Sequence, residues 1–244
     1  MTDAGRRSAK PADRTAAPGR LICRRTLLVS ALAGVTLGAL PNLASAATLI
    51  ELPDAAADQR FSVLYKGDKI GRHTVSYSAA IGQTRVTTEI DLVVKALFLT
   101  LYAFHHRSEE VWRDGRLLSL SSETVEHGEK LHVTGAATAE GFRVVNKAGP
   151  FIAASSALTT NSLWTPAVLE QDTLVDAQHG GVIGVSAHKL GEEQIALAGR
   201  RVQATLYQFI TPYLAGSIWY DRSGRWVQGQ FEHDGALIEY RLDA

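Results

Sequence analysis

The chain has 244 residues with 25 basic and 25 acidic side chains, so its formal net charge is zero. That balance is an average, because residues 1–46 hold seven basic and two acidic side chains while the rest of the chain holds 18 and 23. The composition excludes collagen, long disorder and a polytopic membrane protein, and the acidic body argues against nucleic acid as a partner.

Residues 1–46 have the order of a secretory signal, which is charged, then apolar, then small. Arg24 and Arg25 precede two leucines and an Ala- and Gly-rich stretch over 27–40, and this order resembles a twin-arginine signal. The alternative is an uncleaved anchor, but 14 apolar residues are short of the roughly 20 that span a bilayer. We therefore expect a periplasmic protein, exported by the twin-arginine translocase and cut by signal peptidase after Ala46.

The mature chain is expected to consist of an acidic linker over 47–59 and a single β-rich domain over 60–244. Cys23, the only cysteine, leaves with the signal. The mature protein then has no disulfide, no thiolate nucleophile and no cysteine metal ligand.

Short apolar runs separated by glycine turns predict a β-meander from residue 60 onward. Residues 60–66 and 69–79 are predicted strands joined at Gly67-Asp68. Further two-residue turn signals are Asp114-Gly115, His127-Gly128, Glu140-Gly141, Ser223-Gly224 and Asp234-Gly235. The glycines at 115, 128 and 141 are evenly spaced, as in a meander of strands about 9 to 11 residues long.

The last third of the chain gives the clearest strands. Residues rich in Val, Ile, Tyr, Trp and Phe predict strands over 202–210, 216–221, 225–232 and 236–242. The sequence therefore predicts an all-β fold, an antiparallel meander of about ten strands that forms a strongly curved sheet or half-open barrel, with one or two short helices.

Two segments are ambiguous. Residues 90–104 fit both a helical stripe and two strands interrupted near 95–97, and their β-branched and aromatic flanks favour the strands. Residues 161–171 are predicted to form a short helix, capped by Asn161 or Ser162.

The densest polar group is His105, His106, Glu109 and Glu110. On a helix these side chains could share a metal ion, whereas on a strand four residues span roughly 13 Å, too far for one ion. The strand interpretation places Phe104, His106, Ser108, Glu110 and Trp112 on one face. We expect no metal ion, because the spacing on a strand is too long for one ion and no His-x-His pair occurs in the sequence. We expect no cofactor, because the phosphate-binding and dinucleotide-binding motifs are absent. Ser186 lacks the context of a nucleophile elbow.

Aromatic residues on both faces of the predicted strands favour an apolar binding cavity over a catalytic centre. We expect no catalytic residues. The candidate ligand-binding residues are Phe104, His106, Glu110, Trp112, Trp164, Tyr207 and Trp219.

Several short motifs resemble an uncharacterised family of exported bacterial β-proteins, a domain of unknown function. They are Phe61–Tyr65 with Gly67 and Ile70-Gly71, then Glu110 and Trp112 with 114–117, and 218–221 with Gly224. The resemblance covers most of residues 60–242, and because no catalytic residues are established for that family, none are carried over to this sequence. The predicted meander is also similar to periplasmic lipid and lipoprotein carriers, which bind acyl chains in a half-open barrel.

Three functions are compatible with these observations. The first is a non-catalytic periplasmic protein that binds an apolar small molecule, such as a lipid or lipid-linked envelope component. The second is an assembly or scaffolding protein that binds an envelope protein through a sheet edge or aromatic patch. The third is a hydrolase or isomerase that uses His106 with Glu110 or Asp221.

Overall fold

The computed structural model describes residues 50, 58–96, 99–233 and 235–243. The predicted export signal and its cleavage point after Ala46 lie outside the described residues, as do residues 47–49 and 51–57 of the predicted linker. No helix within the described ranges has both the length and the apolar character needed to cross a membrane.

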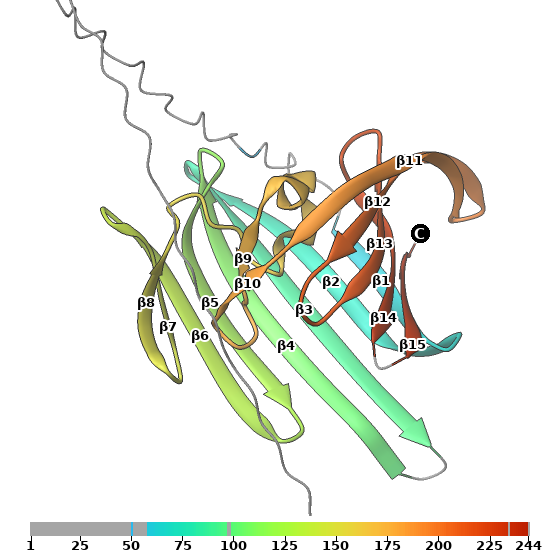
Figure 1. The fold of residues 1–244 in the computed structure, drawn as a ribbon, viewed down its shortest axis with the longest axis horizontal. Helices are drawn as coiled ribbons and strands as arrows, with labels where there is room; N and C mark the ends of the chain where they lie inside the picture. Colours follow the sequence, from blue (N-terminus) through green and yellow to red (C-terminus); the bar gives the residue numbers. More distant parts are fainter. Residues whose placement is uncertain (1–49, 51–57, 97–98, 234, 244) are drawn as a thin grey trace, which may run out of the picture. The chain divides into compact units, whose positions relative to one another are not determined.

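Thirteen strands form one antiparallel sheet (Figure 1). Their bounds are β1 Gln59–Tyr65, β2 Asp68–Ala80, β3 Gln83–Ala96, β4 Leu99–Arg113, β5 Arg116–Glu126, β6 Glu129–Thr138, β7 Gly141–Asn146, β8 Gly149–Ala153, β11 Ser186–Leu197, β12 Arg200–Ile210, β13 Ala215–Asp221, β14 Trp226–His233 and β15 Ala236–Leu242. Two meanders, β1–β8 and β11–β15, join where β1 pairs with β15, so β8 and β11 are the two edges of an unclosed sheet.

Residues 154–185, here called the crossing segment, connect the two edge strands and lie against one face of the sheet, here called the inner face (Figure 1). The segment contains two 3-10 helices, η1 Ser162–Trp164 and η2 Pro166–Glu170, and a small two-stranded sheet, β9 Thr173–Val175 with β10 Val182–Gly184. Thr165 begins η2 because its side chain accepts a hydrogen bond from the Ala167 amide, and Pro166 suits the first helical turn.

The predicted all-β meander and its short helices are confirmed. The ambiguous segment 90–104 forms two strands, because β3 ends at Ala96 and β4 begins at Leu99. Both residues of the Asp114-Gly115 and His127-Gly128 turns have positive φ, which matches the twist of a tight hairpin. The predicted helix over 161–171 forms as the pair η1 and η2.

The sheet has more strands than the ten or so that were expected. Residues 141–153 form a further hairpin, β7–β8, which includes Pro150. A proline within a strand argues against a central position, and β8 can hold one because it lies at the edge of the sheet. The strands β9 and β10 have three residues each, too few to show an alternating pattern.

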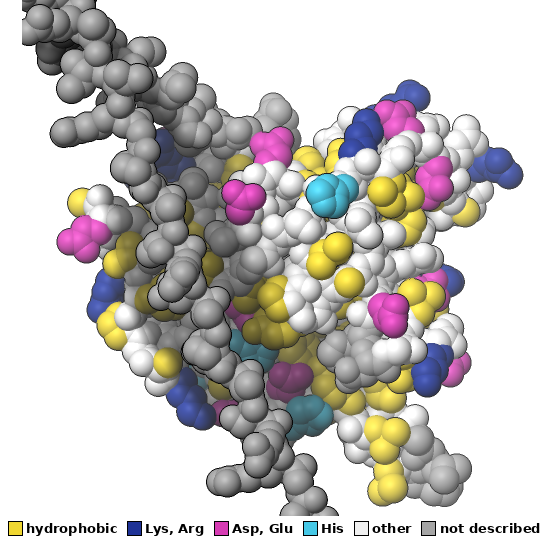
Figure 2. All heavy atoms as spheres, viewed as in Figure 1, with side chains coloured by type: hydrophobic (Ala, Val, Ile, Leu, Met, Phe, Trp, Pro, Cys, Tyr) yellow, Lys and Arg dark blue, Asp and Glu magenta, His cyan; other side chains and the backbone are white. Residues whose placement is uncertain are grey.

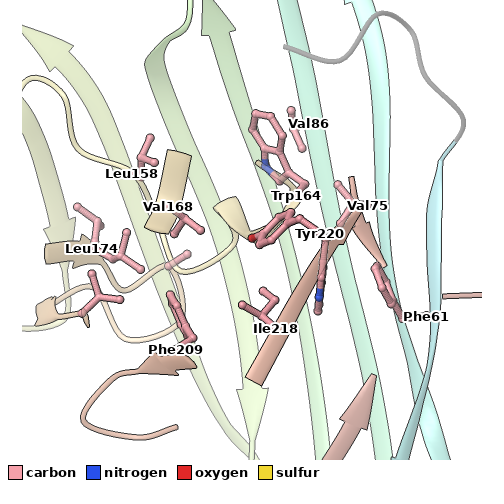
Figure 3. Packing of buried hydrophobic residues seen from close by; sticks show 14 of the residues in the cluster. Phe61, Val75, Val86, Leu158, Trp164, Val168, Leu174, Phe209, Ile218 and Tyr220 are labelled. Carbon is pink, nitrogen blue, oxygen red and sulfur yellow. The ribbon is translucent and has the colours of Figure 1, made fainter. Parts of the chain in front are cut away.

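The main hydrophobic core lies between the crossing segment and the inner face (Figure 3). Leu158, Trp164, Val168 and Leu174 of the segment join one buried cluster with residues of the sheet, among them Phe61, Val75, Val86, Trp112, Phe209, Ile218 and Tyr220. Trp112 and Trp164 meet edge to face at 5.4 Å between ring centroids. The inner face is therefore packed by the chain itself over this area.

Close strand packing should make Gly71 intolerant of a side chain. A Cβ atom at Gly71 would collide with the main-chain oxygen of Asp91 on the neighbouring strand. We expect Gly71→Ala to lower the free energy of unfolding by about 1–3 kcal/mol, measured by urea denaturation. Gly181→Ala, where a Cβ meets nothing within 4 Å, is the control, and equal stability of the two variants would contradict this packing.

Candidate functional site

The inner face of β4 carries the predicted row of mixed side chains. Strand alternation turns its five residues inward, and each exposes at most 5% of its surface: Phe104, His106, Ser108, Glu110 and Trp112. The same alternation turns His105 and Glu109 outward, where they pair with Asp91 and Arg85. The strand interpretation of this polar group is therefore confirmed.

His106 is tied to the crossing segment through Asn161. The Asn161 amide nitrogen lies 2.9 Å from His106 Nε2 and donates to Ser108 Oγ at 2.7 Å. Nε2 then accepts from the amide, and Nδ1 carries the hydrogen that faces Thr124 Oγ1 at 2.8 Å. Burial lowers the pKa of His106 to about 4, so the imidazole is neutral near pH 7.

Glu110 makes a second hydrogen-bonded contact between the sheet and the crossing segment. Thr159 donates its hydroxyl to Oε1, and Trp112 donates its indole N–H to Oε2 at 3.1 Å. Burial raises the pKa of Glu110 to about 7, against the effect of these two donors. Among the described residues, Glu110 and His106 make no direct hydrogen bond to each other. They connect through Thr159 and Asn161, because the backbone amide of Asn161 donates to Thr159 Oγ1 at 3.0 Å.

The remaining predicted residues divide between the two faces. Trp164 is buried against Trp112, and Tyr207 packs edge-on against Tyr220 at 6.2 Å. Trp219 is adjacent to Tyr220 on β13, so its side chain points to the opposite face, where its indole N–H donates to Glu193. The structure therefore brings five of the seven candidates together on β4 and η1. Tyr207 on β12 and Trp219 on β13 contribute to the main core instead of this row, and Trp219 is 5% exposed.

Asp221, the alternative partner for His106, lies at the turn between β13 and β14. Its carboxylate accepts from the amides of Ser223 and Arg225, so it stabilises that turn. Among the described residues, no three His, Cys, Asp or Glu side chains are arranged to hold a metal ion.

A second apolar cluster lies on the inner face beyond the main core. Its buried members are Val63, Ile90, Leu92 and Phe104, and it is flanked by the partly exposed Ile70, Tyr102, Ile238 and Tyr240. All of these side chains belong to strands of the large sheet. The second cluster is therefore an apolar part of the inner face whose flanking side chains remain partly exposed to solvent.

Polar groups border the second cluster on the side of β5. Tyr102 donates its hydroxyl to Glu126 Oε1 at 3.0 Å, and Glu126 Oε2 lies 3.5 Å from His179 Nε2. His179 Nδ1 lies 3.0 Å from Asp176 Oδ2. Figure 2 shows acidic and His side chains set back beside hydrophobic ones in the lower half of the view.

Sequence reasoning did not select these border residues. Glu126 lies two residues after Thr124 on β5, so strand alternation turns both side chains inward. This alternation was the sequence signal that could have indicated Glu126. The approach of His179 to Glu126 depends on where the crossing segment lies, so no local pattern indicates it.

His73 occupies an unusual position between the two clusters. The imidazole is buried, neither ring nitrogen has a hydrogen-bond partner, and its neighbours are the rings of Phe61, Trp226 and Tyr240. Burial, with a smaller effect of His106, lowers the pKa of His73 to about 3. The side chain is therefore packed as a neutral aromatic ring.

Comparison with known proteins identifies a family and a fold. Residues 61–243 match a family described as a domain of unknown function, DUF6134. No curated protein matches the sequence. A crystal structure described as a β-barrel-like protein of the domain of unknown function DUF1849, from Brucella abortus, is similar with a TM-score of 0.55 and 9% identity, over 76% of this chain and 94% of that one. At that identity the likeness shows the fold alone.

The first prediction from this site concerns His73. Its lowered pKa means that the unfolded chain takes up a proton below about pH 6.5 while the folded protein stays neutral until about pH 3. Stability is therefore lost as pH falls through that window. We expect His73→Phe to remove this loss and to stabilise the protein at pH 7 by about 1 kcal/mol, because no polar atom is then buried unpaired. Urea denaturation from pH 4 to 7 measures both effects, with His105→Phe on the outer face as the control.

The second prediction concerns Glu110, whose shift has the opposite sign. Its folded-state pKa is raised from 4.5 to about 7, so its contribution to stability is complete below pH 4.5 and is lost as pH rises through 7. We expect the stability difference between the unmodified protein and Glu110→Gln to fall by roughly 3 kcal/mol from pH 4.5 to 7.5. Glu109→Gln, half-exposed on the outer face, should show no such trend, and a flat difference for Glu110→Gln would contradict the burial effect.

Proposed function

This chain belongs to the DUF6134 family, a domain of unknown function, so we propose a function from its geometry: the protein binds an apolar ligand and does not catalyse a reaction. The ligand class is a lipid or a lipid-linked envelope component. The second apolar cluster on the inner face is the observation that carries this proposal.

The second cluster offers a ligand an apolar surface that is already in place. Phe104 and Leu92 are buried at its base, and Ile70, Tyr102 and Ile238 are partly exposed around them. An apolar chain lying there gains about 25 cal/mol for each Å² that leaves water.

Binding is favoured over acid–base chemistry by the state of His106 and Glu110. Both ring nitrogens of His106 and both oxygens of Glu110 face partners, and the two residues are 3% and 1% exposed. A general acid or base must reach the proton that it transfers. These two side chains instead hold the crossing segment on the sheet.

The predicted ligand-binding residues fall into two groups under this proposal. Trp112 and Trp164 fill the main core, so their role is to keep the crossing segment in place. Phe104 belongs to the second cluster and is the predicted residue that a ligand would approach. Neighbouring side chains that were not predicted, such as Tyr102 and Ile238, complete the site.

The predicted export signal over residues 1–46 supports ligand binding in the periplasm. A twin-arginine signal exports folded cargo, so the sheet and its apolar cluster would form before export and meet lipids in the periplasm. Exported protein is therefore the material to test.

Ile238 and Leu237 give a matched pair of variants for the test. They are adjacent on β15 and point to opposite faces, and Ile238 flanks the second cluster while Leu237 is 46% exposed on the other side. We expect Ile238→Ser to weaken binding of the dye Nile red about tenfold, because an apolar side chain leaves the site, whereas Leu237→Ser leaves binding unchanged. Fluorescence titration measures both, and urea denaturation checks that each variant is folded.

Native mass spectrometry of protein purified from the periplasm without detergent identifies the natural ligand after organic extraction. A co-purifying apolar mass is the expected result. A protein with no bound mass and no Nile red binding would contradict the proposal.

A further inference from the structure

The polar border of the second cluster contains two side chains that face each other without an ordinary hydrogen bond. His179 Nε2 and Glu126 Oε2 are 3.5 Å apart, while the other ends of both side chains are occupied. Tyr102 donates to the second Glu126 oxygen at 3.0 Å, and Asp176 faces the second His179 nitrogen at 3.0 Å. Whether each of these two atoms donates or accepts decides which group can hydrogen-bond to both.

Asp176 fixes which nitrogen of His179 carries the hydrogen. Its side chain is 5% exposed and accepts hydrogen bonds from the amides of Gln178 and His179 at 2.8 and 3.2 Å. A carboxylate held in this way is an acceptor, so the Nδ1 atom that faces it carries the hydrogen. In the neutral imidazole, Nε2 then presents a lone pair toward Glu126.

His179 Nε2 and Glu126 Oε2 are therefore two neighbouring acceptors, and a hydrogen-bond donor is the group that satisfies both. Burial raises the pKa of the Tyr102 hydroxyl, which stays protonated and already donates to Glu126. His179 is about half-exposed and Glu126 is 29% exposed, so a donor can reach both acceptors from outside.

The charges around these two acceptors select among possible donors. The carboxylates of Asp176 and Glu126 contact His179, and the ring of Tyr213 lies beside it. Glu129 and His106 are near enough to act on His179 electrostatically, and the Lys147 ammonium pairs with Glu129. Carboxylates outnumber cations here, so a phosphate or carboxylate head would be repelled and a cationic head attracted.

The apolar surface lies directly beside the same two acceptors. Tyr102 stacks on Phe104 of the second cluster with 6.3 Å between ring centroids, and its hydroxyl reaches Glu126. A ligand with its chain on the second cluster thus has its head at Glu126 and His179.

We propose that His179 Nε2 and Glu126 Oε2 together bind the protonated amine of an amphiphile whose apolar chain lies on the second cluster. This rests on the proposed function and names its ligand class, an apolar chain with a primary ammonium head. The ammonium donates one hydrogen to each acceptor, and the carboxylate of Glu126 balances its charge.

Three amphiphiles with the same chain test the head group. Decylammonium, decanol and decanoate, each below its micelle concentration, compete with Nile red for protein purified from the periplasm at pH 7.5. We expect decylammonium to displace the dye at about tenfold lower concentration than decanol, and decanoate to be the weakest competitor. Glu126→Gln should bring decylammonium to the level of decanol while leaving decanol itself unchanged.

Glu123→Gln is the matched control. Glu123 lies on β5 with Glu126 but points to the outer face, where it is half-exposed, so its removal changes the same net charge without touching the site. The tenfold preference should survive in this variant.

The alternative outcomes separate the two proposals. If decylammonium and decanol compete equally in the unmodified protein, the amine assignment is overturned and apolar binding stays intact. Loss of the preference in both glutamine variants also overturns the amine assignment, because the preference then comes from overall charge. Failure of every amphiphile to displace the dye, or failure of the dye to bind, overturns the proposed function itself.

Discussion

Covering the inner face of a large open sheet is the constraint on which this structure depends. A sheet with one apolar face must bury that face against another layer. Here the chain supplies the layer from its own middle, because the crossing segment connects the two edge strands β8 and β11 and its residues Trp164, Val168 and Leu174 complete the main core. The β1–β15 pair then makes the two meanders one continuous sheet, so both share this single cover.

Polar side chains within the core place the crossing segment at one position. Apolar contacts tolerate sliding, whereas Asn161 and Thr159 have their partners on β4 at His106, Ser108 and Glu110. A buried polar group costs stability unless its hydrogen bonds are made, so a shifted segment would leave several groups unpaired. This explains how the His106 imidazole and the Glu110 carboxyl can lie in the core, because their hydrogen bonds are made. His73 differs, since both of its ring nitrogens are buried with no partner and its ring packs among aromatic neighbours. Among the described residues, the indole nitrogen of Trp164 is likewise buried without a partner.

The same cover divides the inner face into two regions with different properties. Over the main core, the chain fills the space with its own side chains. At the second cluster, the flanking residues Ile70, Tyr102 and Ile238 remain partly exposed. The loop after β9 adds His179 and Asp176 to the border of this region, opposite Glu126. An apolar floor with a few convergent polar groups at one side is the arrangement that small-molecule sites share.

The sequence by itself determined the local structure of this protein. Alternation along β4 placed Phe104, His106 and Trp112 on one face, and the glycine turns placed the hairpins, because both signals arise within a few neighbouring residues. Only the tertiary structure decided which face was covered and by what. The contact between Asn161 and His106 joins residues 55 positions apart, and that between Ser62 and Asp243 joins residues 181 apart. No local pattern encodes such pairings, because they depend on where the crossing segment and the last strand settle against the whole sheet. For the same reason the approach of His179 to Glu126, and with it the candidate site, became visible in the folded chain.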